Sequence, residues 1–100
     1  MTTETIESIK EEIKIEPPKF YKVILHNDDT TSMDFVVAVL THIFHKKFEE
    51  ALEITLAIHN EGEGIAGAPY TREIAEEKTN ETKKYARANG FPLVASFEEL

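Results

Sequence analysis

A chain of 100 residues, of which 41% are hydrophobic and 30% charged, is typical of a single globular domain with a modest core. The net charge of -8, from 19 acidic against 11 basic residues, argues against a nucleic-acid partner, because binding to phosphates depends on cations. Apolar runs are too short to span a bilayer and no secretory signal is recognisable, so we expect no membrane partner and a cytoplasmic location. The absence of cysteine excludes disulfides, thiolate metal sites and a cysteine nucleophile.

Residues 1–18 are predicted to form a flexible N-terminal arm in front of a folded domain over residues 19–100. The arm is rich in charged residues. Its isoleucines Ile6, Ile9 and Ile13 have helical spacing, which permits a transient helix, but so short a helix does not persist in isolation. A linker without structure is the alternative interpretation.

The rest of the chain alternates between strand-like and helix-like patterns. In chain order we predict a strand, two helices, a strand, a helix and a strand, over residues 19–27, 32–46, 48–60, 65–71, 72–89 and 93–97. This β-α-α-β-α-β order indicates an α+β fold, in which three helices pack on one face of a small, three-stranded, mainly antiparallel sheet.

Local signals refine these elements. Thr31 and Asp34 resemble a capping box, which predicts Thr31 as the N-cap of the first helix. Gly62 is expected to end the second helix. Gly67 and Pro69 place a bulge or a sheet edge in the second strand, because both residues weaken a central strand.

A polar corner, Asn27-Asp28-Asp29, joins the first strand to the first helix. Three acceptor side chains in a row can hold a small cation. They are also ordinary turn and capping residues, so the corner alone does not indicate a site.

The two helices that flank the short Lys46-Lys47 connection add a second observation. If they pack antiparallel, the start of the first meets the end of the second. Polar groups of the corner and Thr31 would then face His59 across a gap lined by Met33, Val36, Thr55 and Ile58. An apolar pocket with convergent polar groups at its mouth is the usual form of a ligand site.

These residues resemble the signature of the ClpS adaptor family. The matching segments are Tyr21-Lys22-Val23-Ile24-Leu25, Asn27-Asp28-Asp29, Thr31, Met33, Phe35-Val36, Leu56-Ala57-Ile58-His59, Gly62, Gly67, Tyr70-Thr71, Glu73, Ala75-Glu76, Lys78, Ala86-Arg87, Asn89 and Pro92-Leu93. The resemblance covers residues 19–98. It implies a non-enzymatic adaptor that binds proteins with a free N-terminal Leu, Phe, Tyr or Trp. The adaptor would deliver them to the ClpA- or ClpC-type AAA+ unfoldase of the ClpP protease.

The resemblance also implies roles for particular residues. The N-terminal amine would be held, directly or through water, by Asn27, Asp28, Asp29 and His59. The first side chain would enter a pocket of Thr31, Met33, Val36, Thr55, Ile58 and Leu93. Glu73 and Lys78 would contact the unfoldase. We expect a monomer without cofactor or metal.

Two pocket positions bear on specificity. The residue at Met33 is the family's gate against β-branched first residues. The family commonly has Met where this chain has Thr55, which implies a roomier or more polar pocket floor.

Other readings of the same residues are less favoured. His42 and His45 are three apart on the first helix, but the spacing supplies no third metal ligand. A small hydrolase would use Asp28, Asp29 and His59, yet no nucleophile or metal motif accompanies them. A pocketless interaction domain, similar to the C-terminal domain of the ribosomal stalk protein, would have no need of acceptors that face one another.

Overall fold

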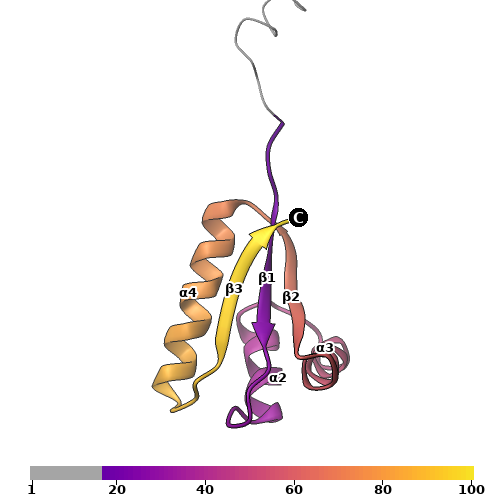
Figure 1. Cartoon of the computed structure of the whole chain (residues 1–100), viewed down its shortest axis with the longest axis vertical. Helices are drawn as coiled ribbons and strands as arrows, with labels where there is room; N and C mark the ends of the chain where they lie inside the picture. The colour runs from indigo at the N-terminus through magenta and orange to yellow at the C-terminus, as the bar shows by residue number, and fades with distance from the viewer. Residues whose placement is uncertain (1–16) are drawn as a thin grey trace, which may run out of the picture.

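The computed structural model describes residues 17–100, so the predicted arm lies almost wholly outside the described residues. The elements are β1 (Tyr21–His26), α2 (Met33–His42), α3 (Phe48–Glu61), β2 (Glu63–Tyr70), α4 (Arg72–Ala88) and β3 (Val94–Glu99) (Figure 1). This order confirms the predicted α+β fold. Within the described part of the chain, no helix is long and apolar enough to cross a bilayer.

Strand β1 lies at the centre of the sheet, between β2 and β3, and pairs antiparallel with both (Figure 1). Its side chains alternate. Val23 and Leu25 are fully buried in the core that the helices cover. On the opposite face Lys22 pairs with Glu98 (3.2 Å), and His26 hydrogen-bonds the hydroxyl of Ser96 on β3. The helices therefore cover one face of the sheet, as predicted.

Strand β2 is an edge strand with an irregular register. Its pairing with β1 shifts between Tyr21 and Val23 and again between Val23 and Ile24. Gly67 and Pro69, from which a bulge or a sheet edge was predicted, lie in this part of β2. The strand has both the irregular register and the edge position. Gly67 leaves room for the ring of Tyr70, whose Cζ would lie 2.8 Å from any Cβ added there.

Helix α2 differs from its predicted limits at both ends. Its N-cap is Ser32, whose hydroxyl accepts from the N–H of Phe35 (3.2 Å), and not Thr31 as predicted. The helix ends at His42 and not at residue 46, because the chain turns at His45, which has a positive φ of 56°. Two apolar side chains past the end of the helix, Ile43 and Phe44, are nevertheless buried in the core, which explains the overlong prediction.

Helices α2 and α3 cross steeply and do not run antiparallel: Figure 1 views α3 along its axis and α2 from the side. The start of α2 still meets the end of α3, because residues from both line one cleft. Thus the expected juxtaposition is present with a different crossing angle.

Candidate functional site

A cleft of about 340 Å³ lies where the β1–α2 corner, the first turns of α2 and the last turns of α3 meet. It is lined by Asn27, Asp28, Asp29, Thr30, Thr31, Ser32, Met33, Val36, Thr55, Ile58 and His59. Nine of these positions were expected from the sequence. Thr30 and Ser32 were not, and only their place between the corner and the helix could have indicated them.

Asp28 organises the corner. One carboxylate oxygen accepts the backbone N–H groups of Thr30 (2.9 Å) and Thr31 (2.6 Å), and the other accepts the hydroxyl of Thr31 (2.7 Å). A carboxylate has about four acceptor sites, so these three bonds leave little capacity for a ligand. The main role of Asp28 and Thr31 is therefore to fix the conformation of the loop. Asn27 and Asp29 beside them are exposed.

The same contacts control the ionisation of Asp28. Partial burial raises the pKa of this carboxyl. The hydrogen bonds from Thr31 and Thr30 and the positive charge of Arg87 outweigh that effect, so the pKa lies below its ordinary value. The corner thus carries a negative charge at neutral pH.

His59 faces this corner because of how α3 ends. The helix closes at Gly62, which has a left-handed φ of 92° and donates to the carbonyl of Ile58 (2.9 Å). The carbonyl of Gly62 accepts the backbone N–H of Asn27 (2.8 Å). Since His59 is in the last turn, this bond places it against the end of β1 at the rim of the cleft.

Apolar side chains form the floor of the cleft. Val36, Ile58 and Thr55 are buried there, and Met33, which is 40% exposed, lies at the mouth. The hydroxyl of Thr55 donates to the carbonyl of Ala51 (2.8 Å) one turn earlier in the helix. Thr55 presents a smaller wall than Met would. It adds little polarity to the cleft, because its hydroxyl proton is already engaged with Ala51.

Three further residues were assigned by resemblance, Leu93 to the pocket and Glu73 and Lys78 to an unfoldase interface. Leu93 does not line the cleft; it is buried in the core just before β3. Glu73 is exposed in the first turn of α4. Lys78, on the same helix, is turned inward: its ammonium donates to the carbonyl of Ile43 (2.9 Å).

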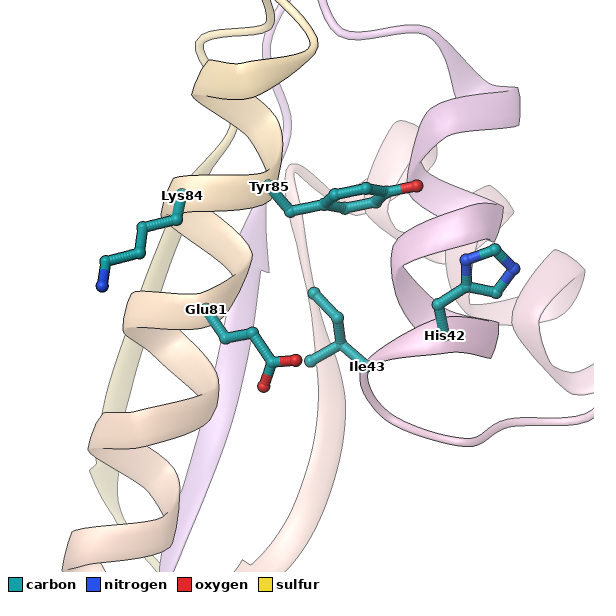
Figure 2. Close-up of a pocket in the computed structure, with 5 residues that line it drawn as sticks. All are labelled: His42, Ile43, Glu81, Lys84 and Tyr85. Carbon is teal, nitrogen blue, oxygen red and sulfur yellow. The ribbon is translucent and has the colours of Figure 1, made fainter.

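A second hollow, of about 460 Å³, lies between α4 and the end of α2 (Figure 2). Ile43 and Tyr85 form its apolar part, and in Figure 2 the Tyr85 ring reaches toward His42 while Lys84 points away. His45, the partner proposed for His42 in a metal pair, does not line it. Within residues 17–100, no three His, Asp or Glu side chains are grouped so as to hold a metal. The convergent acceptors are in the cleft, not in this hollow.

Comparisons with known proteins identify the family of the chain. The family profile described as ATP-dependent Clp protease adaptor protein ClpS matches residues 16–96. The ClpS adapter protein of Wolinella succinogenes is 53% identical over 91% of this chain and 88% of its own, and that of Clostridium acetobutylicum is 50% identical over 94% and 92%. The solved structure of Agrobacterium tumefaciens ClpS2 bound to L-phenylalaninamide superposes with a TM-score of 0.79 and is 33% identical, over 84% of this chain and 100% of that one. The chain therefore belongs to the ClpS family of Clp protease adaptor proteins.

Proposed function

We propose that the cleft binds the unmodified N-terminus of a polypeptide whose first side chain is Leu, Phe, Tyr or Trp, and that the adaptor delivers this polypeptide to a ClpA- or ClpC-type AAA+ unfoldase. The observation that carries the proposal is the meeting of Asn27, Asp29 and His59 at the mouth of a cleft with an apolar floor. Membership of an adaptor family removes the hydrolase hypothesis.

A free α-amino group suits the polar rim. It is an ammonium with three donors and titrates near pH ~8, so it requires several acceptors, preferably charged. The amide of Asn27, the carboxylate of Asp29 and the imidazole of His59 supply them. The start of α2 adds a positive potential, which is unfavourable for a cation. The charges of Asp28 and Asp29 offset it.

The apolar floor suits a large first side chain. Burying a Leu or Phe side chain contributes roughly 1.5–3 kcal/mol. Each charge-assisted hydrogen bond adds about 1.5–3 kcal/mol before the costs of association are subtracted. Two such bonds and one anchor correspond to a dissociation constant on the order of micromolar.

The ligand of the structural neighbour supports this assignment. L-phenylalaninamide, bound by Agrobacterium tumefaciens ClpS2, combines a free amine, a benzyl side chain and an amide. Those are the three features at the start of a polypeptide that begins with Phe. A cleft with acceptors at its mouth also speaks against the pocketless interaction domain.

The unfoldase partner and the oligomeric state are part of the same proposal. The exposed Glu73 and the neighbouring surface of α4 are available to an unfoldase. Lys78 contributes to that contact through the position of α4, because its ammonium is engaged with Ile43. The adaptor acts as a monomer, and the absence of cysteine suits the reducing cytoplasm.

Fluorescence anisotropy tests the proposal directly. One peptide that begins with Phe and carries a dye at its C-terminus is compared in its free and N-acetylated forms. The free peptide should bind with a micromolar or tighter constant and the acetylated one should not bind, because acetylation removes the charge and two donors. His59→Ala should weaken binding of the free form. Equal binding of both forms would exclude amine recognition.

A further inference from the structure

Helix α3 carries a stripe of exposed apolar side chains outside the core. Phe48, Leu52 and Leu56 are 65%, 40% and 44% exposed. Spacing of four residues places them on one face of the helix. The face that α3 buries is a different one, formed by Ala51, Thr55 and Ile58. We call Phe48, Leu52 and Leu56 the apolar stripe.

The apolar stripe borders the cleft. Leu52 and Leu56 lie three residues before and one residue after Thr55, and Leu56 lies three residues before His59. Thr55 and His59 line the cleft. Residues three apart are neighbours on a helix surface, so the stripe begins at the cleft rim and runs back toward the start of α3.

Acidic side chains flank the outer edge of the stripe. Glu49 and Glu53 directly follow Phe48 and Leu52 in the sequence, and both are exposed. At 100° per residue they lie on the side of the stripe away from Thr55. The apolar stripe and its acidic border are therefore complementary to a peptide segment that carries apolar and basic side chains.

We propose that the segment following the first residue of a bound polypeptide lies along the apolar stripe, which favours apolar side chains accompanied by Lys or Arg at these positions. This inference rests on the proposed function. The helix rises about 1.5 Å per residue, so the path from His59 to Phe48 is about 16 Å, the length of roughly five extended residues. Residues two to six of the substrate are therefore the ones that reach the stripe.

Three unlabelled peptides that compete with a labelled reference test this assignment. All begin with Phe: a dipeptide amide, a seven-residue peptide continued by Gly and Ser, and one of equal length continued by Leu, Lys and Arg. The last should bind about tenfold more tightly than the other two, because it buries additional apolar area and pairs with acidic groups. The part of this gain that comes from charge should fall with added salt.

Variants locate the effect. Leu52→Gln with Leu56→Gln keeps good helix formers and should remove most of the gain. Glu49→Gln with Glu53→Gln should remove its salt-dependent part. The matched control is Ile65→Thr with Val94→Thr, because these two side chains are each 49% exposed on β2 and β3. The control should leave the gain unchanged.

The dipeptide amide separates this inference from the function on which it rests. It reports on the cleft alone, and its affinity should be the same for every variant. Equal affinity of the two long peptides for the unchanged protein would overturn the stripe assignment and leave the amine site standing. Failure of the dipeptide amide to bind would count against the proposed function itself. A dimer detected by sedimentation, and dispersed by the Leu52/Leu56 variant, would assign the stripe to a second copy of the chain instead.

Discussion

The backbone N–H of Asn27 donates to the carbonyl of Gly62 over 2.8 Å and ties the end of β1 to the end of α3. The polar corner that forms one wall of the cleft begins at Asn27, and His59 lies about one helical turn before Gly62. This single backbone bond therefore sets the distance between the groups that would hold an amine. It depends on the left-handed conformation at Gly62 (φ 92°), which side chains with a Cβ disfavour.

Replacing that glycine should damage both stability and binding. Gly62→Ala is expected to cost about 1–2 kcal/mol of unfolding free energy, because alanine in the left-handed region is strained. It should also weaken binding of a peptide that begins with Phe. The control is Gly90→Ala, at another left-handed position (φ 78°) after α4. It should cost similar stability in urea unfolding but leave peptide affinity intact; an equal loss of affinity would refute the role given to Gly62.

Substitutions of the two acidic residues of the corner should differ in how their effect on stability depends on pH. The pKa of Asp28 in the folded chain is lowered from the unfolded value of about 4. Its contribution to stability is thus fully present above that pH and is lost as pH falls through the folded-state pKa. Asp28→Asn should cost about 1 kcal/mol near pH 7 by weakening the corner's hydrogen bonds, and this difference should shrink in urea unfolding below pH 4.

Asp29→Asn is the matched control for that series. Asp29 is exposed, so its substitution should change stability by less than about 0.5 kcal/mol at any pH. It should nevertheless weaken binding of the free peptide, since a charged acceptor for the amine is lost. A stability difference for Asp28→Asn that is independent of pH would contradict the assignment.

Some features of the site could be predicted from the sequence and others could not. The juxtaposition of Asn27 and His59 was predicted and is present, but the antiparallel packing from which it was argued is not, because the helices cross steeply (Figure 1) and the bond between Asn27 and Gly62 brings the two ends together. The choice of Ser32 over Thr31 as N-cap was not predictable, since both residues can cap and the outcome depends on the hydroxyl that Asp28 engages. Leu93 was assigned to the pocket by resemblance alone, and its place in the core follows from packing around β3.

Met33 should control which first residues enter the cleft. It lies at the mouth and is 40% exposed. Met33→Ala removes the side chain that would collide with a branched β-carbon, so peptides that begin with Ile or Val should gain affinity while the Phe peptide changes little. Competition anisotropy measures all three. Continued exclusion of Ile and Val would show that the gate is elsewhere.

Thr55 should affect specificity through size and not through polarity. Its hydroxyl already donates to Ala51, so Thr55→Val should keep the ranking of Leu, Phe, Tyr and Trp peptides. Thr55→Met fills the floor and should change the ratio of Trp to Leu affinities by about tenfold. If the valine variant alters the ranking as much as the methionine variant does, the hydroxyl contacts the ligand after all.

Lys78 should matter for stability before it matters for any partner. Its ammonium donates to Ile43 over 2.9 Å and lies 5.8 Å from the ring centroids of both Phe44 and Tyr70, so it joins α4 to the end of α2 and of β2. Lys78→Met keeps an unbranched side chain but loses these interactions, which should cost about 1–3 kcal/mol in urea unfolding. Lys83→Met, at an exposed position of the same helix, should cost almost nothing.

The same variant distinguishes two explanations of any loss in delivery to an unfoldase. If Lys78 acts by holding α4 in place, Lys78→Met should lower both the unfolding free energy and the affinity for the unfoldase. Glu73→Gln, at an exposed position, should weaken that binding without any loss of stability. A Lys78→Met protein as stable as the unchanged chain, yet unable to bind the unfoldase, would mean that the ammonium leaves Ile43 and contacts the partner directly.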